Sequence, residues 1–385
     1  MELKKQNSRV FYWKFLSFAS FSLIFIHACN NGNQGIIEVS QKKAAENNPS
    51  PDQVQNNNFN GSPQNPNFNP TVPTINLGSL AFGGQTNSFA NSQKMLEIGM
   101  SWVKFQHKWS PGQGGQDLAG RISDAKAKGF KVLMSIPGQP HSNAIDYGQY
   151  LNFIEQVAKL TPAPDAIEVW NEPNLDFEWP KGQISPENYV NQMLKPAYAK
   201  IKAANSAIIV ISAAPAPTGF FSGCSANGCD DKFYVERMAA AGAAQALDCI
   251  GVHYNEGIIS PKRNDGDPRG THYTRYFNGM IDTYHRAFGG SKPVCFTELG
   301  FVTSQGFSEG LPPGFSWASN TTVADQAQWH ADAVELAKSN SKVKMIIIFN
   351  VDFDYYSADD PQAGFAIIRK DNSCLACDKI KAITQ

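Results

Sequence analysis

Two acidic residues stand where apolar runs of the chain end. Glu172 follows such a run in "IEVWNEPN", and Pro173 behind it cannot donate to a sheet ladder, so a strand must end at this point. Glu298 occupies a similar place in "CFTELGF". A carboxylic acid and a carboxylate that face each other across a cleft are suited to cleaving a glycosidic bond. One protonates the departing sugar oxygen, and the other meets the positive charge that develops at the anomeric carbon.

Strand-like and helix-like segments alternate through the rest of the chain. The strand-like runs are apolar almost throughout, which is typical of a parallel sheet that is covered on both faces. Helical patterns separate them, including 146–160, 186–205, 231–247 and 321–339. We expect eight strands, at 76–83, 102–106, 131–137, 166–173, 207–214, 248–255, 293–301 and 343–351.

Eight strand–helix units favour a (β/α)₈ TIM barrel, of the α/β class, over an open doubly wound sheet. No glycine-rich phosphate loop follows the first strand, since "FGGQTNS" has neither nucleotide-binding spacing. The active site of such a barrel lies at the carboxyl ends of its strands. Glu172 and Glu298 would end strands four and seven, and both would therefore point into one cleft.

With "WNEPN" on strand four and "TELG" on strand seven, residues 74–385 resemble the clan A retaining glycoside hydrolases, with their cellulase-like and β-xylosidase-like branches. The resemblance implies that Glu172 is the acid/base and that Glu298 is the nucleophile, which forms a covalent glycosyl-enzyme. It also implies that Asn171 binds the sugar 2-hydroxyl and that His253 lines the subsite at the cleaved bond. Trp179 would contribute an aromatic face to the sugar groove.

The chain departs from this family at three positions. Lys104 stands where cellulase-like members carry arginine, which keeps the charge but loses bidentate geometry. His253-Tyr254-Asn255 replaces a His-x-Tyr pattern, so the tyrosine that would contact the nucleophile is out of register and Tyr254 or Asn255 must line the site instead. Phe349 or Tyr355 would replace the tryptophan that ends strand eight. Asp354 is the alternative nucleophile should Glu298 be misplaced.

The first 73 residues read as export and tether segments. Lysines and an arginine precede the apolar stretch Phe15 to Ile26, which is too short to span a bilayer. It runs into "IHAC", which resembles the lipobox of bacterial lipoproteins, although an ordinary signal peptide or an uncleaved anchor would also fit. We predict a signal over 1–28, lipidation of Cys29, and a disordered Asn/Gln/Pro-rich tether over 29–73. The protein would then be attached to a membrane of the bacterial cell envelope, facing the periplasm or the outside.

Composition limits the partners, metals and disulfides that the chain can be expected to have. The net charge of −1 and the pI of about 6.7 give no reason to expect a nucleic-acid partner. The 7 His and 7 Cys form no metal-ligand motif, so we predict no metal and no cofactor. Cys224–Cys229 and Cys374–Cys377 are candidate disulfides of an exported protein, whereas Cys249 and Cys295 read as buried thiols or an inter-strand bridge. We expect a monomer.

The sequence thus predicts a membrane-tethered enzyme that hydrolyses β-linked oligo- or polysaccharides through two glutamates, with retention of configuration. The alternative is a non-catalytic glycan-binding surface lipoprotein, or adhesin, on a barrel whose catalysis has decayed. The altered positions Lys104, Asn255 and Phe349 are the features that favour this alternative.

Overall fold

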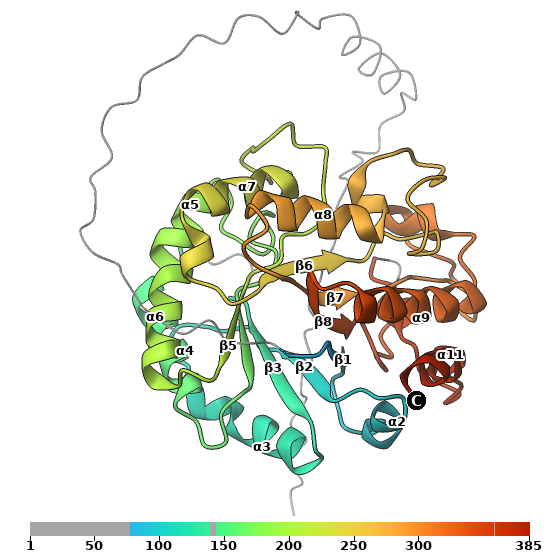
Figure 1. The fold of residues 1–385 in the computed structure, drawn as a ribbon, viewed down its shortest axis with the longest axis horizontal. Coiled ribbons are helices and arrows are strands. Elements are labelled where there is room, and N and C mark those ends of the chain that lie inside the picture. Colours follow the sequence, from blue (N-terminus) through green and yellow to red (C-terminus); the bar gives the residue numbers. More distant parts are fainter. Residues whose placement is uncertain (1–77, 139–143, 358) are drawn as a thin grey trace, which may run out of the picture. The chain divides into compact units, whose positions relative to one another are not determined.

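Eight parallel strands form a nearly closed barrel in the computed structural model, which describes residues 78–138, 144–357 and 359–385 (Figure 1). The strands follow in the order β5-β4-β3-β2-β1-β8-β7-β6, so each is a neighbour of the next along the chain. The predicted (β/α)₈ barrel is confirmed. The strands are β1 (Ala81–Gln85), β2 (Trp102–Gln106), β3 (Lys131–Ile136), β4 (Ala166–Val169), β5 (Ile209–Ser212), β6 (Ile250–Tyr254), β7 (Val294–Leu299) and β8 (Val343–Ile348).

The barrel closes weakly between β5 and β6. These two strands share an isolated bridge between Ile211 and Cys249 instead of a full ladder. Ser212 supports the join, because its hydroxyl accepts a hydrogen bond from the amide of Gly251 at 3.1 Å. A disulfide between Cys249 and Cys295 ties the start of β6 to β7 on the other side. The inter-strand bridge was one of the two readings left open by the sequence.

Helices surround the strands, as Figure 1 shows. The segment between β4 and β5 contains a π-helix, whose Tyr189 links these two strands. Its hydroxyl donates to the carbonyl of Val169 and accepts from the amide of Ala213. The helices are α2 (Ser92–Glu97), α3 (Ala119–Ala127), α4 (Tyr147–Ala158), α5 (Pro186–Asn188), the π-helix η2 (Tyr189–Leu194), α6 (Lys195–Ala204), α7 (Asp231–Ala240), α8 (Phe277–Ala287), α9 (Val323–Ser339), α10 (Gln362–Phe365) and α11 (Leu375–Thr384); the 3₁₀ helices are η1 (Gly115–Leu118), η3 (Ala243–Gln245), η4 (Tyr273–Arg275) and η5 (Pro313–Ala318).

The inside of the barrel changes from apolar to charged along its axis. Near the strand starts it is filled by Trp102, Leu133, Ala166 and other buried apolar side chains. Successive side chains of a strand alternate between its two faces, so Lys104 and Glu168 point inward two residues further along β2 and β4. Both are fully buried. The apolar layer therefore forms a floor beneath a charged layer.

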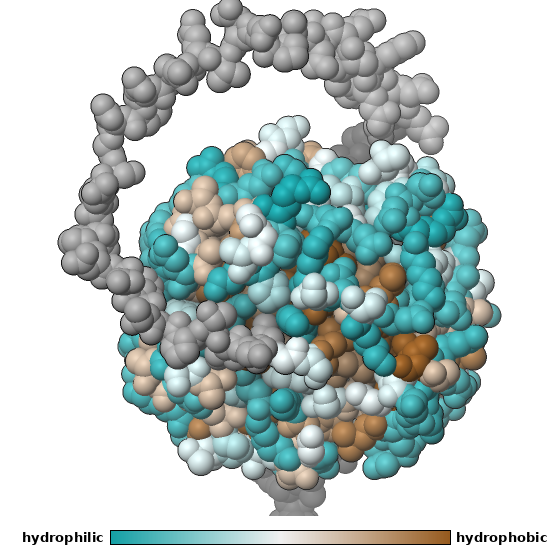
Figure 2. Space-filling view, viewed as in Figure 1, coloured by the Kyte–Doolittle hydropathy of each residue, from teal (hydrophilic) through white to brown (hydrophobic). Residues whose placement is uncertain are grey.

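The outer surface is mostly hydrophilic in the view of Figure 2. The C-terminal helix α11 packs along α9, and Lys338 at the end of α9 donates to the carbonyl of Ile383. Thr384 reaches the carbonyl of Ile98 after α2, so α11 joins the last unit of the barrel to the first. No helix among the described residues is long and apolar enough to cross a membrane. The predicted signal, Cys29 and the tether lie outside the described residues.

His330 of α9 is a histidine whose burial should make stability depend on pH. It is fully buried against Phe301, makes no hydrogen bond within the described chain, and burial lowers its pKa to about 3. Below pH 6.5 the unfolded chain binds a proton that the folded one does not, so stability falls as pH drops toward 3. Between pH 7 and pH 5 this histidine should account for a loss of about 2 kcal/mol.

We therefore expect His330→Leu to reduce the loss in free energy of unfolding between pH 7 and pH 5, measured by urea denaturation at both pH values. His285→Leu is the matched control, because this histidine of α8 is only partly buried, and it should change that loss much less. An unchanged pH dependence in H330L would show that His330 is protonated in the folded protein.

Candidate active site

The two glutamates that ended apolar runs in the sequence meet at the carboxyl ends of β4 and β7. The Nδ1 atom of His253, at the end of β6, lies 2.9 Å from Oε1 of Glu172 and 3.8 Å from Oε2 of Glu298. These two carboxylate oxygens are therefore at most about 6.7 Å apart, the sum of both distances. All three side chains are buried. Two carboxyl groups and an imidazole thus form one cluster.

The loop after β4 holds Glu172 in an unusual backbone conformation. Trp170 has φ 78° and Glu172 has φ 38°, which non-glycine residues adopt rarely and which cluster at functional sites. The amide of Glu172 donates to the carbonyl of Ala214 beyond β5, and Asn174 exchanges hydrogen bonds with the backbone of Ala216. The β5 side of the barrel therefore fixes the direction of Glu172.

Trp170 supports the same loop from below. Its indole nitrogen donates to the carbonyl of Glu178, and its ring packs edge-on against Tyr150 and Trp179. Gly138, just after β3, lies so close that a Cβ atom there would come within 2.1 Å of the Trp170 ring. A side chain at position 138 would therefore displace the ring that supports the loop.

Glu298 is held by polar groups on both carboxylate oxygens. The ammonium of Lys104 donates to Oε1 at 2.9 Å, and the amide of Asn255 donates to Oε2 at 3.2 Å. Burial alone would raise the pKa of Glu298, but the charges of His253 and Lys104 and these hydrogen bonds bring the pKa below its usual value. Glu298 is therefore a buried but ionised carboxylate, as a nucleophile must be.

The two cationic partners keep their protons for the same reason. Burial opposes the charge of Lys104, yet Glu298 and Glu168 raise its pKa above the ordinary value. Burial likewise opposes a charged His253, and the carboxylates of Glu298 and Glu172 raise its pKa. The cluster is thus a set of mutually stabilised charges.

Several predicted site residues join this group, and others do not. Asn171 is buried at the end of β4, with its side-chain oxygen free of hydrogen bonds to described residues. Tyr254 points to the outer face of β6, where its hydroxyl donates to the carbonyl of Arg275. Trp179 is buried against Trp170 and Tyr189, with no exposed face on which a sugar could stack.

Of the residues predicted near the end of strand eight, one is buried and two are exposed. Phe349 directly follows β8 in a cluster with Phe353 and Phe365, and it is 8% exposed. Asp354, the alternative nucleophile, is exposed, and Tyr355 is exposed as well. Among the described residues, Asp354 makes no contact with Glu172 or Glu298. The predicted disulfides Cys224–Cys229 and Cys374–Cys377 are formed.

Glu168 and Thr297 were not singled out from the sequence, and Glu178 was assigned no role in the site. Glu168 and Thr297 lie in the barrel below the pair, and their hydrogen bond of 2.6 Å joins β4 to β7. Glu178 lies buried after β4, and one of its oxygens has no hydrogen bond to described residues. An acidic residue inside the apolar run "AIEV" was the available signal, because a buried charge requires a partner.

Several buried polar atoms at or after the strand ends are unsatisfied by the described residues. Buried side-chain nitrogens and oxygens at the strand ends lack hydrogen bonds to described residues, and a ligand with many hydroxyl groups would supply them. Among the described residues no group of three or more His, Cys, Asp or Glu is arranged to hold a metal ion. The atoms are Gln85 Oε1, Gln106 Oε1, Trp109 Nε1, Asn171 Oδ1, Glu178 Oε2, His253 Nε2 and Asn255 Oδ1.

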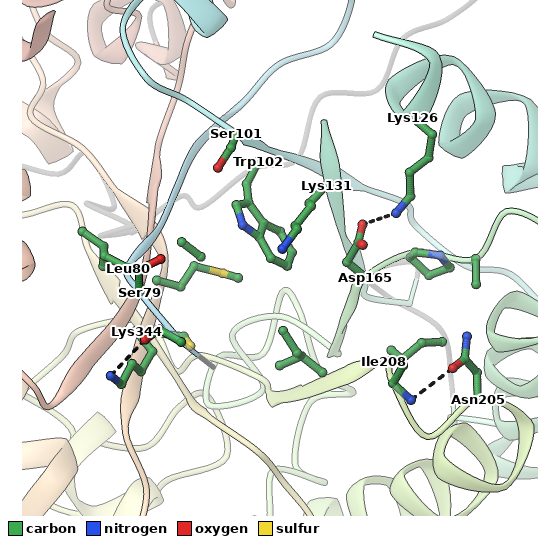
Figure 3. A pocket seen from close by; sticks show the side chains of 18 of the residues that line it. Ser79, Leu80, Ser101, Trp102, Lys126, Lys131, Asp165, Asn205, Ile208 and Lys344 are labelled. Atoms are coloured by element: carbon green, nitrogen blue, oxygen red, sulfur yellow. Dashed lines mark hydrogen bonds and ion pairs between the residues drawn. The ribbon is translucent and has the colours of Figure 1, made fainter. Parts of the chain in front are cut away.

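A cavity of about 670 Å³ lies at the opposite end of the barrel, around the strand starts (Figure 3). Lys126, Lys131 and Lys344 border it, and Lys126 is paired with Asp165. Catalytic residues of such barrels come from the carboxyl ends of the strands, while the amino end serves stability. The cavity is therefore not part of the candidate active site.

Comparison with known proteins supports the fold and nothing finer. No family model matches the chain, and no curated protein matches its sequence. A family 39 glycoside hydrolase of Bacteroides cellulosilyticus is similar in structure, with a TM-score of 0.55 and 15% identity over 81% of this chain and 65% of that one. The chain thus spans under two thirds of that relative.

Two further structures are similar over most of their length. The GH53 catalytic domain of Ignisphaera aggregans has a TM-score of 0.54 and 15% identity, covering 81% of this chain and 98% of that one. A GH5_18 protein of Bifidobacterium longum, in complex with Manβ1-4GlcNAc, has a TM-score of 0.51 and 10% identity, covering 79% and 78%. The chain shares its barrel fold with these glycoside hydrolases.

Glu178 offers a test of the electrostatics at this site. Burial, with the charges of Glu172 and Glu298, raises its pKa well above the usual value despite the opposing charge of Lys108. The unfolded chain loses this proton near pH 4.5 and the folded chain keeps it, so stability falls as pH rises above 4.5. The loss is about 1.4 kcal/mol for every pH unit over which the folded group stays protonated.

We expect Glu178→Gln, which mimics the protonated acid, to be more stable than the wild type at pH 7 and to lose this advantage at pH 4.5. Thermal and urea unfolding at the two pH values measure the difference. Glu236→Gln, on the exposed face of α7, is the control and should show no such change. Equal stability of E178Q and wild type at both pH values would mean that Glu178 is ionised when folded.

Proposed function

We propose that this chain is a retaining glycoside hydrolase that acts on β-linked glycans. The observation that carries the proposal is the shared contact of His253 with Glu172 and Glu298. It limits the distance between the two nearest carboxylate oxygens to about 6.7 Å, a limit that admits the spacing of ~5–5.5 Å at which the second carboxylate attacks the sugar directly. The barrel fold shared with glycoside hydrolases agrees with this activity.

In the first step, Oε2 or Oε1 of Glu298 attacks the anomeric carbon while Glu172 gives its proton to the departing glycosidic oxygen. The C–O bond to the leaving group breaks, and an ester between Glu298 and the sugar forms. In the second step, Glu172 takes a proton from water, whose oxygen attacks the same carbon and releases Glu298. Two inversions return the original configuration.

The polar side chains around the pair have distinct tasks in this proposal. Asn171 and His253 present unsatisfied atoms to sugar hydroxyls, and Asn255 and Lys104 hold Glu298 in place. Hydrogen bonds that strengthen as charge develops lower the barrier more than equal binding of the substrate does. A binding protein on a decayed barrel is the competing function. It would need none of the charges that keep Glu298 ionised.

Export as a lipoprotein belongs to the same proposal. All six cysteines other than Cys29 are joined in three disulfides, which suits an oxidising compartment outside the cytoplasm. The sequence before the barrel supplies the apolar export segment and the lipobox-like "IHAC" that would anchor Cys29 to a membrane of the cell envelope. The substrate would then be an extracellular or envelope polysaccharide.

Covalent labelling tests the catalytic assignment. We expect a panel of 2-deoxy-2-fluoro β-glycosides with dinitrophenyl leaving groups to contain at least one sugar that adds a single glycosyl mass to the protein. Peptide mapping should place the label on Glu298, because the fluorine slows the second step and traps the ester. Glu298→Gln should take up no label.

Glu172→Ala separates the two roles. It should still be labelled, since dinitrophenolate departs without an acid, but its turnover of unactivated glycans should fall by about 10²- to 10⁴-fold. With a dinitrophenyl β-glycoside, whose first step needs no acid, added azide should speed the turnover of this variant and yield a β-glycosyl azide, because azide attacks the ester without a general base. Asp354→Asn is the matched control and should be labelled like the wild type. A wild-type protein that is never labelled and cleaves no β-glycan, yet binds one, would support the adhesin instead.

A further inference from the structure

We propose that Glu168 is a positioning residue for the paired carboxylates: together with Thr297 it holds Lys104 beside Glu298, and its negative charge sets the pH range of the reaction. This inference rests on the proposed function, because a pH range of catalysis exists only if the pair is catalytic. Glu168 itself lies too deep in the barrel to be a catalytic group.

The contacts of Glu168 are those of a counter-charge. It lies on β4, four residues before Glu172, which follows that strand, and its side chain is fully buried. Oε1 accepts the hydroxyl of Thr297 at 2.6 Å, and Oε2 lies 3.5 Å from the ammonium of Lys104. The same ammonium is 2.9 Å from Glu298. Lys104 therefore lies between the carboxylate of Glu298, which is part of the site, and that of Glu168, which lies below it.

This arrangement is not explained by stability alone. Buried ion pairs lose so much hydration that apolar replacements of the same volume are often as stable or more stable. The floor of the same barrel shows that the chain does fill its interior with apolar side chains. A pair of charges kept directly beneath the reacting carboxylates therefore calls for a role in their chemistry.

A count of the buried charges suggests what that role is. Neighbouring carboxylates raise the pKa of Lys104 and of His253, the two cations lower that of Glu298, and Glu168 is the fourth group, in contact with Lys104. With these four groups charged, the cluster is neutral when Glu172 still carries its proton. That is the state in which Glu172 can protonate a leaving group. Without Glu168 the cluster would hold one positive charge in excess, which favours loss of this proton.

The other groups that face the cluster do not take over this task. Tyr150 and Tyr189 stay neutral, because burial raises the pKa of each hydroxyl, and both donate to backbone carbonyls. Glu178 is held protonated, and Lys108 lies on its side of the site, in the loop after β2. The remaining strands turn neutral or apolar side chains inward, namely Gln85 of β1, Ser135 of β3, Ser212 of β5 and Ile347 of β8.

The test compares two pairs of variants that differ only in the charge at position 168: wild type with Glu168→Gln, and Lys104→Met with the double variant K104M/E168Q. The dependence of kcat/KM on pH is measured with an unactivated β-glycan that the wild type cleaves, because its leaving group needs the proton of Glu172. Removing the negative charge should move the alkaline limb of the profile to lower pH by about one unit in each pair. Thr297→Val keeps the charge and should leave the limb in place.

A second readout does not depend on activity. The imidazole nitrogens of His253 report its protonation by NMR, and its pKa should fall when the charge of Glu168 is removed, again in both pairs. If E168Q does not fold, the K104M pair still measures the same charge. In that pair both charges of the ion pair are absent from the double variant.

The outcomes separate this inference from the proposed function. Shifted limbs together with a lowered His253 pKa support it. Unmoved limbs and an unmoved His253 titration, with activity reduced equally at all pH values, would show that Glu168 is structural and would overturn it. If the wild type hydrolyses no glycoside, the proposed function fails, and an unchanged His253 titration would then reject the electrostatic part separately.

Discussion

Ionised groups in a dry interior must be balanced by opposite charges, and this constraint organises the centre of the barrel. Glu298 is buried yet ionised, which is affordable only because Lys104 and Asn255 contact its two oxygens and His253 lies beside it. Strands β2, β6 and β7 each supply one part of this arrangement. The regular barrel is thus the means by which residues far apart in sequence share one electrostatic environment.

The loop after β4 meets a second requirement, which is rigidity. The carboxylic acid proposed to protonate a leaving group must be held in place, and Glu172 is held in a backbone conformation that costs energy. Hydrogen bonds from Glu172 and Asn174 to the segment after β5, and from the Tyr189 hydroxyl to Val169, stabilise it. These bonds cross the same side of the barrel where β5 and β6 join weakly. Glu172 is thus held by the β4–β5 pair and not by the weak join between β5 and β6.

The sequence predicted the barrel because strand and helix patterns repeat, and it located the pair because the strand ends are where such barrels place their chemistry. It could not choose between neighbours on one strand. His253 of β6 and Asn255 just after it both reach the site, whereas Tyr254 between them packs against Phe277 of α8, a distinction set by the register of the sheet. Trp179 looked like a sugar platform, but its ring fills space beneath the loop.

Glu168 and Thr297 were not identified from the sequence for a related reason. Their role depends on a hydrogen bond between β4 and β7 across the barrel, which no local sequence pattern predicts. The partnership also gives a reason for lysine at position 104. An arginine fork suits one carboxylate held by two bonds, whereas an ammonium is a compact charge that can lie between two carboxylates on different strands. Lysine in place of arginine at position 104, which favoured the hypothesis of a decayed barrel, is then another way to place a positive charge beside Glu298. A protein that only binds glycans would have no need to meet that demand.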